Sequence, residues 1–131
     1  MSKKERSFLT RALEIARRSN FGSIKIGACI VNKHRVIGVG CNNPKTNPIQ
    51  KELNAFRDNN GQNWKHYVHA ETAAILNAVS DLQGSTIYIN RVHVHGSVMC
   101  KPCEACHRLL RRVGVKRVVY NTDDGVQEYR V

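Results

Sequence analysis

The segment from Ile24 to Cys41 reads IKIGACIVNKHRVIGVGC and decides the fold of this chain. Two runs rich in β-branched residues, 24–31 and 36–41, are separated by the four polar residues 32–35. β-Branched side chains favour strands, and a short polar connection between two such runs favours an antiparallel hairpin. The chain is therefore expected to build a β-sheet around this hairpin.

Helical and strand-like segments continue on both sides of the hairpin. Residues 7–18 carry apolar side chains with the 3.6-residue period of a helix, which residues 20–23 end. The later segments predict, in order, a helix over 70–79, a strand over 85–94, a helix over 102–113 with Pro102 in its first turn, and a last strand over 116–120. The order α-β-β-α-β-α-β indicates an α/β fold with helices flanking a mixed sheet, in a single domain spanning 1–131.

Residues 42–65, which follow the hairpin, have the composition of a long loop. They contain two prolines, a glycine and several asparagines, and residues 51–57 within them favour a short helix. Long connections inside a compact domain are usually functional or partly helical. We therefore expect this segment to be functional or partly helical.

The composition is that of an ordinary globular protein with an unusually high positive charge. Of its 131 residues, 41% are hydrophobic and 24% are charged. No apolar run approaches the roughly 20 residues that span a bilayer, and no apolar segment of a signal peptide follows the charged N-terminus. We therefore expect a cytoplasmic protein with no membrane partner. The net charge of +11 favours an anionic partner, either a nucleotide or a polynucleotide, with a solubilising surface as the alternative.

Two short motifs contain residues of the types that bind zinc. His69-Ala70-Glu71 begins one predicted helix, and Pro102-Cys103-Glu104-Ala105-Cys106 begins another. Cys103 and Cys106 are three residues apart, so they face the same side of a helix whose N-terminus favours the thiolate form. A catalytic zinc site has three protein ligands and leaves one position for water. His69, Cys103 and Cys106 are therefore the predicted metal ligands, and Glu71 is the predicted proton carrier.

Two other kinds of site would use some of the same residues. A closed structural zinc site needs a fourth ligand, for which His107 and His66 are the nearest candidates, but it leaves Glu71 without a task. A redox-active pair of cysteines does not explain the histidine and glutamate. The combination of H-x-E with P-C-x-x-C is instead the signature of zinc-dependent deaminases.

Beyond these motifs, the chain resembles the cytidine and deoxycytidylate deaminase superfamily over nearly its whole length. Arg18-Ser19, residues 26–32 (IGACIVN) and residues 36–42 (VIGVGCN) are similar to the N-terminal half of deoxycytidylate deaminases. The resemblance implies a three-layer fold, a bound Zn²⁺ and a homo-oligomer. It also implies conversion of dCMP to dUMP, with Glu71 moving a proton from water to the pyrimidine ring.

The same resemblance suggests which residues contact the substrate. Asn42 matches an asparagine that contacts the sugar, although an asparagine at this position also suits a turn. The backbone N–H groups near Ala70 and Cys103 would orient the substrate. Lys45 is a candidate phosphate contact, but the segment NPKTNP (43–48) replaces the glycine-rich phosphate segment of the family.

The high charge leaves a second class of substrate open, because phosphate contacts dominate affinity for nucleic acids. The alternative function is deamination of a base within a polynucleotide, either cytosine in single-stranded DNA or adenosine in tRNA. A catalytically silent relative is a third reading, which the intact Glu71 opposes. Other candidates depend on single residues: Cys29 in the core, Cys41 and Cys100 in the pocket wall, exposed His93 and His95, and Arg91 and Lys101 as phosphate contacts.

Overall fold

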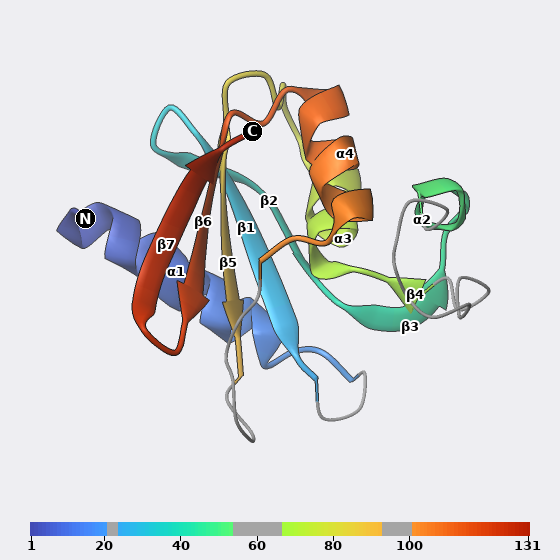
Figure 1. The fold of residues 1–131 in the computed structure, drawn as a ribbon, viewed down its shortest axis with the longest axis horizontal. Coiled ribbons are helices and arrows are strands. Elements are labelled where there is room, and N and C mark those ends of the chain that lie inside the picture. The colour runs from blue at the N-terminus through green and yellow to red at the C-terminus, as the bar shows by residue number, and fades with distance from the viewer. Residues whose placement is uncertain (21–23, 54–66, 93–100) are drawn as a thin grey trace.

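A computed structural model describes residues 1–20, 24–53, 67–92 and 101–131 of the chain. Five strands form one sheet in the order β2-β1-β5-β6-β7 (Figure 1). Their bounds are β1 (Ile26–Asn32), β2 (Arg35–Cys41), β5 (Thr86–Arg91), β6 (Arg117–Thr122) and β7 (Gly125–Arg130). β5 and β6 run parallel, and the other neighbouring pairs are antiparallel. The hairpin and the mixed sheet predicted from the sequence are therefore confirmed.

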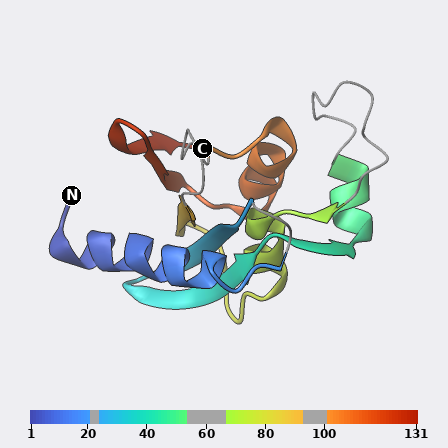
Figure 2. The same ribbon diagram turned by 90° about the horizontal axis from the view of Figure 1, so that it is seen from below.

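Helices cover both faces of the sheet. Figure 2 shows α1 (Lys3–Ala16) on one side of the sheet and α4 (Glu104–Val113) on the other. The α1 face buries one cluster, formed by Leu9, Ala12, Cys29, Val31, Tyr88 and Val119. The opposite face packs against α3 (Ala70–Leu76) and α4 through a second cluster, which includes Ala28, Ile30, Ile87, Ile89, Ala70, Ala74 and Leu110. The three-layer α/β fold is confirmed, and Cys29 lies in the core as expected.

Two glycines let the helices approach the sheet closely. A Cβ atom on Gly40 of β2 would lie 2.4 Å from the backbone nitrogen of Ala74 in α3. A Cβ atom on Gly27 of β1 would lie 2.1 Å from the carbonyl oxygen of Ala12 in α1. Any larger residue at these positions would push the helix away from the strand. Gly40 therefore fixes the distance of α3, and of the motif at its start, from the sheet.

The segment predicted as a long loop contains three short elements. They are β3 (Asn43–Thr46), α2 (Pro48–Leu53) and β4 (Tyr67–Val68), and β3 pairs with β4 in a separate two-stranded sheet. The side-chain oxygen of Asn47 accepts a hydrogen bond from Ile49 N at 2.9 Å, and Pro48 occupies the first helical position, where its fixed φ is favourable. The short helix was therefore predicted three residues too late.

Two predictions near the C-terminus were wrong. The helix over 102–113 begins at Glu104, because Cys103 has an extended backbone (φ −70°, ψ 170°) and is the N-cap, which places Pro102 before the helix. The strand over 116–120 is not the last, because β7 pairs with β6 after a tight turn that ends at Gly125, with φ +111°. β7 was missed because its six residues are mostly exposed and show no apolar alternation. Within the described parts, no helix is long and apolar enough to cross a membrane.

Candidate active site

The side chains of His69, Cys103 and Cys106 converge between the starts of α3 and α4. Their potential ligand atoms all lie within 4.8 Å of one another. His69 Nδ1 lies 3.2 Å from Cys106 Sγ and 3.6 Å from Cys103 Sγ, so Nδ1 is the ring nitrogen that faces both thiols. One imidazole and two thiols are a donor set that suits zinc. The three predicted ligands are therefore positioned together for a metal ion.

The convergence follows from how the two helices begin. His69 is the N-cap of α3 and Cys103 is the N-cap of α4, and both have an extended backbone. N-cap side chains usually accept a hydrogen bond from their own helix, but neither of these does. Both side chains are instead turned toward the cluster. Cys106 lies one turn into α4 and is fully buried.

The two thiols differ in their affinity for a proton. A hydrogen bond with Cys106 is the main cause that lowers the pKa of Cys103, and His69 lowers it further. The same hydrogen bond raises the pKa of Cys106, as does its burial. A second thiolate in this buried site needs a compensating cation. The chemistry of the pair therefore fits a divalent metal ion.

Glu71 occupies the second position of α3 and is only 6% exposed. Burial raises the pKa of its carboxyl group, and the charge of His69 opposes this shift. Cys103 and Cys106 act on the same carboxyl group, which places it beside the thiols. A carboxyl group with a raised pKa holds a proton more tightly than an ordinary one, which suits a group that accepts a proton and passes it on. The structure thus brings together a candidate metal site and a candidate acid–base group.

The three predicted substrate contacts lie on different parts of the structure. Ala70 is the first residue of α3, where a backbone N–H has no acceptor within the helix. Lys45 is exposed on β3, the partner of the strand β4 that leads directly into His69. Asn42 is buried: its Oδ1 accepts from Ile26 N at 2.9 Å and its Nδ2 donates to Ile24 O at 2.7 Å. An amide can make further bonds, so the sugar contact of Asn42 stays a prediction.

His107 does not belong to the cluster, although it follows Cys106. Its Nδ1 lies 3.4 Å from Tyr129 Oη and its Nε2 lies 3.2 Å from Arg111 Nη2. Among the described residues, the group suited to a metal contains only His69, Cys103 and Cys106. Three ligands match a catalytic zinc site, which keeps one position open.

The structure also places residues near the site that the sequence did not single out. Burial raises the pKa of Tyr129, on β7, to about 12, and the nearby Glu71 carboxylate acts in the same direction. The ammonium group of Lys101 lies 5.5 Å from the centre of the Tyr129 ring. Gln50 of α2 is fully buried beside the start of α3. Nothing local marks Tyr129 or Gln50, since neither lies in a motif.

The other candidate residues lie in several parts of the chain. His66, His93, His95 and Cys100 lie outside the described residues. Cys41 is partly buried at the end of β2, and burial raises the pKa of its thiol. Arg91 ends β5.

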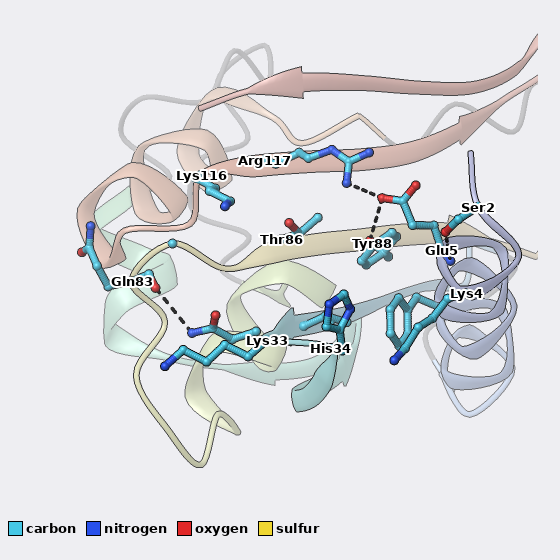
Figure 3. A pocket seen from close by; sticks show the side chains of 14 residues that line it. Ser2, Lys4, Glu5, Lys33, His34, Gln83, Thr86, Tyr88, Lys116 and Arg117 are labelled. Atoms are coloured by element: carbon cyan, nitrogen blue, oxygen red, sulfur yellow. Dashed lines mark hydrogen bonds and ion pairs between the residues drawn. The ribbon is translucent and has the colours of Figure 1, made fainter.

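A separate pocket of about 640 Å³ lies near the far end of α4 (Figure 3). Gly84 N donates to Gly114 O at 2.8 Å, which places the pocket-lining residues Gln83 and Gly84 beside the C-terminal end of α4. The ten residues of α4, or about 15 Å, lie between that end and the N-cap Cys103, and Cys106 lies in the first turn of the helix. Its ionisable lining residues are Lys4, Lys33, His34, Lys116, Arg117, Tyr88 and Glu5. We refer to this site as the basic pocket.

Known proteins share both the motifs and the architecture. The family model for the cytidine and deoxycytidylate deaminase zinc-binding region matches residues 2–122. The deoxycytidylate deaminase of Mus musculus is 33% identical over 122 residues, covering 88% of this chain but 63% of that protein. The chain thus spans slightly less than two thirds of this relative. The deoxycytidylate deaminase of Mycobacterium phage D29 is 33% identical over 124 residues, covering 86% of this chain and 90% of that protein.

Solved structures with the same fold are more distant in sequence. The dCMP deaminase from the cyanophage S-TIM5 superimposes with a TM-score of 0.63 at 23% identity, covering 92% of this chain and 85% of that chain. The cytidine deaminase from Burkholderia pseudomallei gives 0.65 at 19% identity, covering 99% and 93%. These likenesses establish the fold, while the family model and the phage relative establish the family. The chain belongs to the cytidine and deoxycytidylate deaminase family and carries its zinc-binding region.

Proposed function

We propose that this chain is a zinc-dependent deaminase that converts dCMP to dUMP. The observation that carries the proposal is the buried Glu71 beside the three-ligand cluster of His69, Cys103 and Cys106. The relatives supply the substrate class, because the mouse and phage proteins are both deoxycytidylate deaminases.

The proposed metal ligands are His69 Nδ1, Cys103 Sγ and Cys106 Sγ. A zinc ion bound there would lower the pKa of a coordinated water and so make a nucleophile available near neutral pH. Glu71 would take a proton from the attacking water and deliver it to the ring nitrogen beside C4 while the water oxygen bonds to C4. It would then take the remaining proton of that oxygen and pass it to the amino group, so that ammonia leaves as the C4–N bond breaks and the C4 carbonyl forms. One water is consumed, and one ammonia leaves for each dCMP converted.

The proposed substrate contacts involve Ala70, Lys45 and Asn42. The N–H of Ala70, which has no acceptor within its own helix, suits the cytosine carbonyl because the start of α3 presents it beside Glu71. Lys45 suits the phosphate because it is an exposed cation near the strand that enters the site. Asn42 suits the sugar because its side-chain amide can make further hydrogen bonds beyond those to residues 24 and 26.

A polynucleotide substrate is the alternative, and the net charge of +11 favours it. The basic pocket does not extend the metal site, however, because it lies near the opposite end of α4. A mononucleotide is therefore the better-supported substrate. We further propose that the protein acts in the cytoplasm as a homo-oligomer, as the family resemblance implies.

A deamination panel tests the proposed function directly. The zinc-loaded protein is assayed with dCMP, CMP, dCTP, cytidine, single-stranded DNA and tRNA at low and moderate salt. We expect dCMP to give the highest kcat/KM, with little dependence on salt. A preference for DNA or tRNA that falls steeply with salt would support the alternative. Failure to deaminate any of the six would refute the enzyme assignment.

A further inference from the structure

Gln50 is a fully buried polar residue that touches the start of the metal-bearing helix α3. Its Oε1 accepts a hydrogen bond from His69 N at 3.2 Å and another from Thr72 Oγ1 at 2.6 Å. Both Gln50 and Thr72 are 0% exposed. One buried oxygen thus holds the residues on either side of Ala70-Glu71.

Gln50 supplies the start of α3 with a hydrogen bond that the His69 side chain does not make. A residue at the N-cap normally stabilises the helix start with its own side chain, but the ring of His69 faces the two thiols. The backbone of His69 must therefore be held by another group. Gln50 provides that group from α2, an element nineteen positions earlier in the chain.

The residue beside Gln50 contacts the other metal-bearing helix. Ile49 packs against a cluster that contains Cys103, Ala105 and Leu109 of the α4 region. Consecutive residues of α2 therefore contact α4 and α3, which supply the cysteines and the histidine respectively. Because the three ligand atoms come from two helices, their spacing depends on how these helices are held together.

We propose that Gln50 is a positioning residue for the metal site: its Oε1 fixes the start of α3 and thereby the orientation of the His69 ring and of Glu71. The proposal rests on the zinc site of the proposed function. Groups that orient metal ligands from outside the site commonly change metal affinity 10–100-fold when they are removed. The two hydrogen bonds of Gln50 Oε1 reach the backbone of His69 and the hydroxyl of Thr72, so the role proposed for Gln50 is positioning and not catalysis.

Zinc affinity is the main test, because it can be measured without substrate by competition with a chromophoric chelator. Gln50→Leu keeps the approximate size of the side chain but removes the acceptor. We expect zinc affinity to fall about 10–100-fold. We also expect kcat for dCMP to fall about tenfold while KM changes less, because the proposed contacts of Asn42 and Lys45 lie outside α3.

A second pair of variants keeps the test decisive if Gln50→Leu does not fold. Thr72→Val is nearly isosteric and removes the hydroxyl donor to Gln50, whereas Thr72→Ser retains it. We expect Thr72→Val to weaken zinc binding several-fold and Thr72→Ser to restore most of the affinity. Asn90→Leu is the matched control, because Asn90 is a buried residue whose Nδ2 donates to Leu9 O at 3.1 Å on the α1 side.

The outcomes separate this inference from the proposed function. Weaker zinc binding in Gln50→Leu or Thr72→Val, with affinity retained in Thr72→Ser and Asn90→Leu, supports the positioning role. Affinity within twofold of the unmodified protein in both variants, or an equal loss in Asn90→Leu, overturns it. If the unmodified protein binds zinc but does not deaminate dCMP, the proposed function fails while the affinities still decide the role of Gln50.

Discussion

The polar groups at the two ends of α4 are arranged differently: they converge in a buried site at one end and are spread over several elements at the other. At its N-terminal end, Cys103 and Cys106 converge with His69 within 4.8 Å, and Glu71 is buried beside them. At its C-terminal end, the basic pocket carries cations spread over several elements, including the exposed side chains of Lys33 and Lys116. In the basic pocket, Glu5, Tyr88 and Arg117, which are partly or fully buried, also shift one another's pKa values, but the lysines are exposed and screened by water. Among the described residues, a convergent set of metal-binding donors lies only at the N-terminal end of α4, so we assign the proposed chemistry to this end and call it the metal end.

The two ends of α4 also differ in what holds their polar groups in place. At the metal end, the starts of α3 and α4 bring the His69 ring close to both thiols, and Gln50 accepts hydrogen bonds from His69 N and Thr72 Oγ1. In the basic pocket, Arg117 pairs with Glu5 and Glu128, and these ion pairs join α1, β6 and β7. The metal end thus combines buried metal-binding donors with a buried carboxyl group, as the proposed reaction requires. The ion pairs of the basic pocket mainly connect secondary-structure elements.

Glu71→Gln should have the largest effect, because it removes the proton carrier and keeps the shape of the side chain. We expect kcat for dCMP to fall about 10²–10⁴-fold while zinc stays bound. Turnover and metal content are measured on the same sample. Glu104→Gln is the control, since Glu104 is exposed and paired with Arg108. Retained activity in Glu71→Gln would remove Glu71 from the mechanism.

Metal removal should have the next largest effect. A ligand at 1,000 times its Kd stabilises the folded state by about 4 kcal/mol. We expect a chelator to lower Tm by roughly 10–20 °C and added zinc to restore it. Cys106→Ala should abolish this zinc-dependent shift. Cys29→Ala should retain the shift, because Cys29 lies in the α1-side cluster. An equal shift in both variants would contradict the assigned ligands.

Gly40→Ala tests whether the approach of α3 to the sheet controls the metal end. The added Cβ would collide with Ala74, so we expect a loss of about 1–3 kcal/mol in the free energy of unfolding and weaker zinc binding. Gly84→Ala is the control near the basic pocket, where an added Cβ meets no atom within 4 Å. Its φ of +76° should cost about 1–2 kcal/mol without changing zinc affinity. Urea unfolding and chelator competition separate the two effects.

Glu5→Gln should change stability but not catalysis. The hydrogen bond with Arg117 lowers the pKa of Glu5 below its unfolded value of 4.5. A lowered folded pKa contributes stability that is present above pH 4.5 and is lost as pH falls through the folded value. Because the Glu5 side chain is 23% exposed, we expect at most about 1 kcal/mol. Urea unfolding between pH 7 and pH 2 should show this difference disappearing in acid.

The smallest effect is expected from neutralising the basic pocket. The double variant Lys33→Gln and Lys116→Gln removes two exposed cations far from the metal end. We expect kcat/KM for dCMP to stay within about twofold at moderate salt, because screening limits charge effects over this distance. A tenfold loss would show that the two ends of α4 are functionally coupled.

The features that depend only on neighbouring residues could be predicted from the sequence. The hairpin followed from β-branched runs around a polar connection, and the ligands followed from donor types at helix starts. The sequence placed Pro102 in a helix because proline suits a first turn, but the extended backbone of Cys103 delays the helix start by two residues. It missed β7 because that strand is mostly exposed and has no apolar alternation.

The sequence by itself determined the chemistry: which donors are present, how they are spaced, and that a glutamate lies two residues after the histidine. Only the tertiary structure decided which of these donors lie side by side, because side chains far apart in the chain are brought together by packing. It placed His69 Nδ1 beside the thiols, turned His107 toward Tyr129, and put Gln50 of α2 behind the start of α3. Spacing in sequence specifies neighbours on one helix. The distance between two helices is set by the sheet, by Gly40 and by the buried groups between them.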